Sequence, residues 1–169
     1  LEVPDDIFTE EVDSSLLDSY RVQRRSRPVA DSAEINELIG LILNARCPVV
    51  VAGQGILQGN ACDELKELAE LLQVPVMSTL NGKSCFPENH PLALGCAGKS
   101  RSGQINHFLG KTDVVVGLGT SFTRSFYITP FPREGRTFAQ LTNWEGDISK
   151  DYPIDLGIVG DAKTTISAM

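Results

Sequence analysis

Long apolar runs are missing from this 169-residue sequence, and none of its stretches approaches the roughly 20 apolar residues that a membrane-spanning helix needs. Positive charge is also scarce, because 15 lysines and arginines stand against 22 aspartates and glutamates, for a formal net charge of −7. Proteins that bind nucleic acid need a positive surface for the phosphates. We therefore expect no nucleic-acid partner and no membrane span. The lack of a basic segment followed by an apolar leader predicts a cytoplasmic protein.

Patterns that hold metals or perform catalysis are missing as well. The cysteines form no C-x-x-C pair and have no histidine at zinc-ligand spacing, so we expect reduced thiols and no metal site. His90 and His107 lie near no serine, cysteine or carboxylate in a nucleophile arrangement, and Lys83 stands outside any Walker pattern. The sequence thus presents no catalytic residue. The four cysteines are Cys47, Cys62, Cys85 and Cys96.

What the sequence does contain is an alternation of short apolar runs and amphipathic segments. Apolar residues at helical spacing predict a helix that starts at Ser32, capped by Asp31 or Ser32 itself. The β-branched run 49–52 is typical of a strand covered on both faces. The other predicted elements are helices over 60–72 (capped by Asn60), 102–109 and from 161, a helical turn near 148, strands over 75–78, 113–119, 137–142 and 156–159, and an irregular stretch over 79–98. This order predicts an α/β fold, an open, doubly wound, mostly parallel sheet of five to six strands with helices on both faces, which is Rossmann-like.

Residues 1–31 differ in character from residues 32–169, which carry the alternation. Residues 8–31 are rich in charge and show no sustained period, so we interpret them as a linker over the domain surface. Residues 1–4 look like the end of a strand, and the pattern at Met169 is still helical, so we expect a piece of a longer polypeptide. A basic cluster follows an acidic opening and is interpreted as solvated. It comprises Arg21, Arg24, Arg25 and Arg27.

Small, polar, glycine-rich segments follow the predicted strands. Ligands of doubly wound sheets bind at the carboxyl ends of the strands, where the strand order reverses. Glycine lets a ligand approach the backbone, and free amide groups can hold an anion, although each glycine pair taken singly is more often a tight turn between a strand and a helix. The candidate nucleotide-binding residues are Gly53, Gln54, Gly55, Thr79, Leu80, Asn81, Gly82, Gly119, Thr120, Ser121, Asn143, Gly160 and Asp161.

Taken as an ordered set, several segments resemble the central domain of thiamine-diphosphate-dependent enzymes of the acetolactate-synthase type. The segments are 48–57, 67–72, 74–83, 86–92, 94–98, 112–119 and 159–162, and residues 1–7 resemble the last strand of the domain that precedes the central domain in these enzymes. The resemblance implies a homo-oligomeric parent enzyme that makes or breaks carbon–carbon bonds of 2-oxo acids with thiamine diphosphate and magnesium. It also implies that the other domains of the parent chain bind that cofactor, since this sequence has no Gly-Asp-Gly triplet. The central domain would then supply packing, subunit contacts and a nucleotide pocket.

In that family the pocket holds FAD in acetolactate synthases and ADP in some relatives, and it is empty in others. This sequence departs from the FAD pattern at Thr120, where the family has arginine, and at 142–144, where it has Asp-x-Asp. The substitutions remove charge-assisted hydrogen bonds to phosphate and ribose. Two other hypotheses stay open. One is a stand-alone FAD- or ADP-binding module such as an electron-transfer flavoprotein domain, and the other is a purely structural interaction domain.

Overall fold

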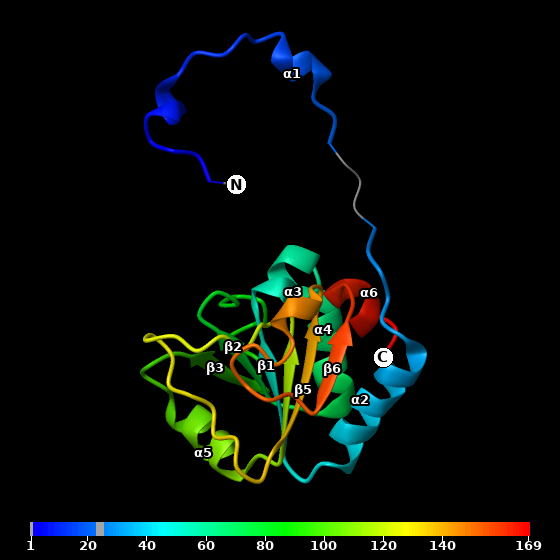
Figure 1. The fold of residues 1–169 in the computed structure, drawn as a ribbon. Coiled ribbons are helices and arrows are strands. Elements are labelled where there is room, and N and C mark those ends of the chain that lie inside the picture. The colour runs from blue at the N-terminus through cyan, green and yellow to red at the C-terminus, as the bar shows by residue number, and fades with distance from the viewer. Residues whose placement is uncertain (1, 23–25) are drawn as a thin grey trace.

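Six strands form one parallel sheet in the computed structural model of this protein, which describes residues 2–22 and 26–169 (Figure 1). The strands are β1 (Pro48–Ala52), β2 (Val76–Thr79), β3 (Ala93–Ala97), β4 (Val114–Leu118), β5 (Thr137–Thr142) and β6 (Leu156–Val159). Their order is β3-β2-β1-β4-β5-β6, and every neighbouring pair is parallel. Strands β2 and β3 lie on one side of β1, and the chain then crosses back to place β4, β5 and β6 on its other side. The predicted doubly wound sheet is confirmed, and the strand order reverses between β1 and β4.

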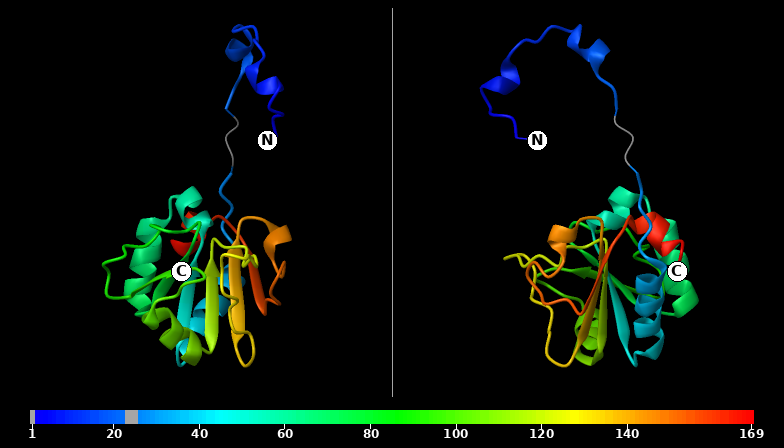
Figure 2. Two further views of the ribbon diagram at one scale, coloured as in Figure 1. Left: turned by 90° about the vertical axis from the view of Figure 1, so that its left-hand side faces the viewer. Right: turned by 45° about the vertical axis from the view of Figure 1, so that its right-hand side comes forward.

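Both faces of the sheet are covered, which explains why its central strands are continuously apolar (Figure 2). One face packs against α2 (Ser32–Asn44), α4 (Cys62–Leu72) and α6 (Ala162–Ile166), and the other against α5 (Gly103–Lys111). Within β1, Val50 and Ala52 belong to the first core, whereas Val49 and Val51 belong to the second. The second core continues into an aromatic cluster that lies next to the long segment after β4. This cluster comprises Phe122, Phe131, Phe138 and Tyr152.

The stretch 79–98, predicted to be irregular, contains the edge strand β3. Its sequence, Ala-Leu-Gly-Cys-Ala, offers little apolar alternation, and its pairing with β2 shifts register between Val76 and Met77. Gly95 also takes a positive φ of 98° within the strand. A short strand of small residues with an irregular register carries no clear period of two, so the pattern missed it.

Asn60 was predicted to cap the helix over 60–72, and this prediction is wrong. An additional short helix, α3 (Gln54–Gly59), precedes it, and Asn60 ends α3 in the left-handed region with φ 53°. The following helix α4 begins at Cys62 without a side-chain cap. Two glycines weaken the helical signal of α3, which is stabilised by packing of the fully buried Ile56. At α2 the predicted cap is confirmed, because Asp31 accepts a hydrogen bond from the Ala33 amide at 2.7 Å.

Asp113 joins the turn between α2 and β1 to the start of β4. Its two carboxylate oxygens accept hydrogen bonds from the backbone amides of Arg46 and Cys47, each at 2.9 Å. Partial burial acts to raise the pKa of Asp113, but these amides outweigh that effect, and the pKa lies below its ordinary value. An ionised carboxylate thus holds the edge of the sheet opposite to the strand carboxyl ends.

The N-terminal segment behaves differently in its two parts. Residues 2–22 are exposed throughout, form only the single turns η1 (Ile7–Thr9) and α1 (Leu16–Ser19), and lie away from the sheet (Figures 1 and 2). Residues 26–31 instead contact the domain, because the Pro28 carbonyl accepts from the Asp161 amide at 2.8 Å and the buried Ala30 donates to Thr165.

Among the described residues, the predicted contact of the linker with the domain surface is therefore present in residues 26–31 and absent from residues 2–22. The predicted strand at 1–4 is absent from residues 2–4, while Leu1 lies outside the described residues, as do Arg24 and Arg25 of the basic cluster. Within the described ranges, no helix is long and apolar enough to cross a membrane.

Candidate functional site

A cleft of about 1200 Å³ opens at the carboxyl ends of the strands, where the strand order reverses. Parallel strands all end at this edge, so segments far apart in the sequence meet here. Eleven of the thirteen predicted nucleotide-binding residues line the cleft. They are Gln54, Gly55, Thr79, Leu80, Asn81, Gly119, Thr120, Ser121, Asn143, Gly160 and Asp161.

The two remaining residues, Gly53 and Gly82, do not line the cleft, because they pack the strand-end turns against one another. A Cβ on Gly53 would lie 2.3 Å from the carbonyl oxygen of Gly119. A Cβ on Gly82 would lie 2.5 Å from the carbonyl oxygen of Ala52. These contacts are shorter than any side chain tolerates, so glycine is required there for backbone packing rather than for approach of a ligand.

The glycine amides that the sequence offers to an anion are used within the protein. Gly53 and Gly55 donate to the carbonyls of Leu118 and Gly119 at 2.9 and 2.8 Å. In the same way Gly119 donates to Leu141 at 2.9 Å, and Gly160 donates to Thr142 at 2.8 Å. These hydrogen bonds join the segments that follow β1, β4 and β6 to one another and to the ends of β4 and β5. A ligand in the cleft would need its polar contacts from other groups.

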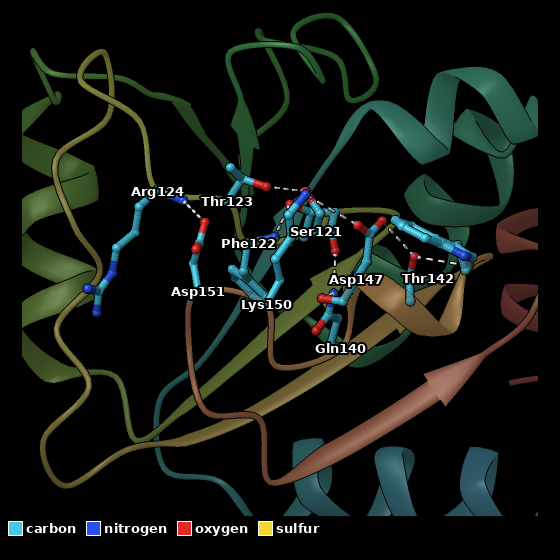
Figure 3. Close-up of polar contacts among 11 residues, drawn as sticks. Ser121, Phe122, Thr123, Arg124, Gln140, Thr142, Asp147, Lys150 and Asp151 are labelled. Atoms are coloured by element: carbon cyan, nitrogen blue, oxygen red, sulfur yellow. Dashed lines mark hydrogen bonds and ion pairs between the residues drawn. The ribbon is translucent and has the colours of Figure 1, made fainter.

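The turn after β4 is held in place by an aromatic side chain. Phe122 has a positive φ of 48°, its amide donates to the Thr120 hydroxyl at 3.2 Å, and its ring is buried. Gly117 makes room for that ring, since a Cβ there would lie 2.2 Å from it. Arg124 follows this turn but lies over the ring of Tyr152, and its amide donates to Asp151, away from the Thr142 side (Figure 3). The cation nearest in sequence to Thr120 therefore does not line the cleft.

Gln140 connects the turns after β4 and β5. Its Nε2 donates to the carbonyls of Thr120 and Asp147, both at 3.0 Å, and the side chain is fully buried (Figure 3). Its Oε1 is buried without a hydrogen-bond partner in the described part of the chain. The orientation of the amide is fixed, because both acceptors are carbonyls and only an N–H donor can bind them. Gln140 thus positions two walls of the cleft without lining it.

Two carboxylates line the cleft, and both interact with neighbouring protein groups. Asp161 caps α6 by accepting a hydrogen bond from the Thr164 amide at 3.1 Å. Asp147 accepts from the Thr142 hydroxyl at 3.4 Å and lies 3.9 Å from the ammonium group of Lys150. Asn143, a neutral side chain, is exposed at the cleft edge. The acidic side chains here therefore serve the turns that form the walls.

Sequence reasoning missed part of the lining. Ser26, Arg27 and Pro28, which the sequence places in a linker, form one side of the cleft, and Tyr127 and Ile128 come from the long segment after β4. The linker residues reach the cleft because Pro28 hydrogen-bonds to Asp161, more than 100 residues away in the sequence. No local pattern encodes such a contact, so nothing in the sequence could have found it.

The remaining candidate groups lie outside the cleft. His90 bonds Glu70 at 3.0 Å through Nε2, and this hydrogen bond lowers the pKa of the glutamate. All four cysteines are free thiols, and burial raises the pKa of Cys85 to about 12, so this thiol is a poor nucleophile. Among the described residues, no group of three or more His, Cys, Asp or Glu side chains could hold a metal ion.

A scan of protein families matches residues 35–169 to the model described as thiamine pyrophosphate enzyme, central domain. The chain therefore belongs to the thiamine pyrophosphate enzyme family and corresponds to its central domain. More particularly, it is similar to acetolactate synthases. It is 41% identical over 133 residues to a probable acetolactate synthase large subunit from Methanococcus aeolicus, an alignment that covers 77% of this chain and 22% of that protein. It is 30% identical over 171 residues to the glyoxylate carboligase of Escherichia coli O157:H7, covering 100% of this chain and 29% of that protein.

Solved structures agree with this assignment. The X-ray structure of a Mycobacterium smegmatis protein assigned as a thiamin diphosphate-dependent enzyme superposes with a TM-score of 0.72 at 26% identity, covering 87% of this chain and 29% of that one. Benzoylformate decarboxylase from Polynucleobacter necessarius has the same fold, with a TM-score of 0.73 at 22% identity, and 94% of this chain and 29% of that one are covered. The chain thus spans less than a third of the length of these proteins.

Proposed function

We propose that this chain is the non-catalytic central domain of a cytoplasmic, homo-oligomeric, thiamine-diphosphate-dependent enzyme that acts on 2-oxo acids as a transferase or lyase. Its tasks are to support the neighbouring domains, to provide subunit contacts and to hold a nucleotide in the cleft. The observation that carries the proposal is the cleft itself, which lies at the switch point of a doubly wound sheet and is lined by eleven of the predicted residues.

The donor groups of the cleft do not fit thiamine diphosphate and magnesium. Magnesium sites that hold a diphosphate need carboxylate or amide oxygens that are free to coordinate. The two carboxylates of the cleft, Asp147 and Asp161, are both hydrogen-bonded to neighbouring residues, and its other side-chain oxygens belong to neutral amide and hydroxyl groups that cannot balance the charge of magnesium. In the proposed enzyme the parts of the parent chain beyond this segment therefore hold the cofactor, and no catalytic step is assigned to this domain.

A nucleotide fits the size and the mixed lining of the cleft. Threonine, serine, asparagine and glutamine side chains line it together with the apolar residues Leu80, Tyr127 and Ile128. Such a lining can contact both an apolar ring and polar hydroxyl groups. Residues 142–144 lack the acidic side chains of the FAD pattern, and Thr120 stands where that pattern has arginine. Fewer charge-assisted contacts therefore remain for a dinucleotide, which favours ADP over FAD.

The single tryptophan of the chain provides a test of nucleotide binding. Trp144 directly follows the cleft residue Asn143, and its side chain is largely exposed. We expect its fluorescence to change in a saturable way when ADP is titrated into the protein, and to change less with FAD at equal concentration. Absence of any response to ADP or FAD would instead favour the purely structural domain. Purified protein that is yellow with tightly bound FAD would favour a stand-alone flavoprotein module.

A further inference from the structure

We propose that Arg27, in the segment before the first helix of the domain, binds a phosphate group of the nucleotide in the cleft. The inference rests on the nucleotide cleft proposed above and names the residue that recognises the charged part of the ligand. The ligand class is a nucleoside phosphate, recognised through its phosphate by a guanidinium group. In the sequence Arg27 belongs to a basic cluster that looks like a solvated connection.

The first argument is the charge of the lining. Among the described residues that form the cleft, Arg27 is the only lysine or arginine. The carboxylates Asp147 and Asp161 line the same cleft and would repel a phosphate, although each accepts a hydrogen bond from a neighbouring residue. A phosphate in this cleft therefore needs a positive partner, and Arg27 is the group in the described lining that can supply one.

The second argument is that the usual backbone donors are occupied. The amides of Gly53, Gly55, Gly119 and Gly160 all donate to backbone carbonyls at the end of β4 or β5 or directly after β4. In many doubly wound folds such glycine amides bind the phosphates of a nucleotide. Because they are used internally here, anion binding shifts to a side chain. A nucleotide can then bind through a side-chain donor, although the glycine amides are used for packing within the protein.

The third argument is that Arg27 is held at the cleft rather than free in solvent. One of its guanidinium nitrogens, Nη1, donates to the carbonyl of Gly59 at 3.0 Å. The next residue, Pro28, accepts from the Asp161 amide at 2.8 Å, and the buried Ala30 donates to Thr165 at 3.2 Å. A guanidinium carries five N–H donors in a planar fork, so a bond to Gly59 leaves others for a phosphate. Its position is thus set before the ligand arrives, which lowers the entropic cost of binding.

Isothermal titration calorimetry with ADP and with adenosine tests the assignment, because the two probes differ only in phosphate. We expect Arg27→Ala to weaken ADP binding about ten- to a hundred-fold, the loss typical of a hydrogen bond to a charged group, and to leave adenosine binding within about two-fold. Arg27→Lys should bind ADP with intermediate affinity, because it keeps the charge but loses the planar fork.

Arg46→Ala is the matched control. Arg46 lies at the opposite edge of the sheet with a side chain that is 92% exposed, so its removal should leave the affinity for both probes unchanged. Equal ADP affinity in wild type and Arg27→Ala overturns the assignment and leaves the nucleotide cleft standing. An equal loss for ADP and adenosine overturns it too, because Arg27 would then only shape the wall. If the wild type binds neither probe, the proposed nucleotide cleft fails together with this inference.

Discussion

Gly119→Ala is expected to lower the free energy of unfolding by about 3 kcal/mol or more. Gly119 has a φ of 62°, in the left-handed region that disfavours a side chain. A Cβ there would also lie 2.7 Å from the amide nitrogen of Ile56 and 2.8 Å from the carbonyl carbon of Gly55. Both neighbours are backbone atoms in the first turn of helix α3, so the strain cannot be relieved by a rotamer change. Urea denaturation followed by circular dichroism measures the loss.

Gly40→Ala is the control for this experiment. Gly40 lies inside α2, its φ is not positive, and a Cβ there would meet no atom within 4 Å. Because alanine favours the helix, this variant should gain up to about 1 kcal/mol. Comparing the two variants therefore separates the general effect of replacing glycine by alanine from the effect of the close backbone contacts at Gly119. Similar stabilities for Gly119→Ala and wild type would contradict the close packing of the turns after β1 and β4.

Gln140→Glu is expected to cost about 3 kcal/mol or more at pH 7, because it places a carboxylate in a fully buried position between two carbonyl oxygens. The Nε2 donor that holds Thr120 and Asp147 together is lost at the same time. Burial raises the pKa of the introduced carboxyl in the folded protein above its value of about 4.3 in the unfolded chain. The ionisation penalty is therefore absent below about pH 4 and grows as the pH rises through that value.

Gln140→Leu serves as the uncharged comparison. It leaves the same two carbonyls without a donor, at a cost of about 2 kcal/mol, and carries no titrating group. We therefore expect the stability difference between the two variants to be small near pH 4 and to widen toward pH 7. Denaturation curves of both variants at these two pH values give the comparison. A difference independent of pH would mean that solvent reaches position 140 and that the bridge between the two turns is not buried.

The fold followed from the sequence where its elements have a strong period. The run 49–52 is apolar on both sides because β1 is covered on both faces, and the spacing after Ser32 matches the buried face of α2. Edge strand β3 and helix α3 were missed, since both are short, contain glycine and depend on tertiary contacts for their stability. The capping role given to Asn60 failed for the same reason, because α3 already ends there.

The candidate site was predictable in its place but not in its chemistry. Parallel strands end at one edge, so the residues after them had to meet there, and most of those named from the sequence do. The role of the glycines changed, because the partners of Gly53 and Gly119 are carbonyls of the neighbouring strands β4 and β5, which only the folded chain brings near. The roles of Arg27 and Gln140 could not be predicted from the sequence for a related reason. Their partners, Gly59 and Asp147, are set by the path of the chain in space.

The central claim is that this chain is a central domain with a nucleotide cleft and without the thiamine diphosphate site. The most direct measurement is its melting temperature with saturating thiamine diphosphate and magnesium, compared with saturating ADP. A ligand present at about 100 times its Kd stabilises a protein by about 2.7 kcal/mol, which raises the melting temperature of a domain of this size by several degrees. We expect such a rise with ADP and none with thiamine diphosphate and magnesium. A saturable rise with thiamine diphosphate and magnesium would contradict the account.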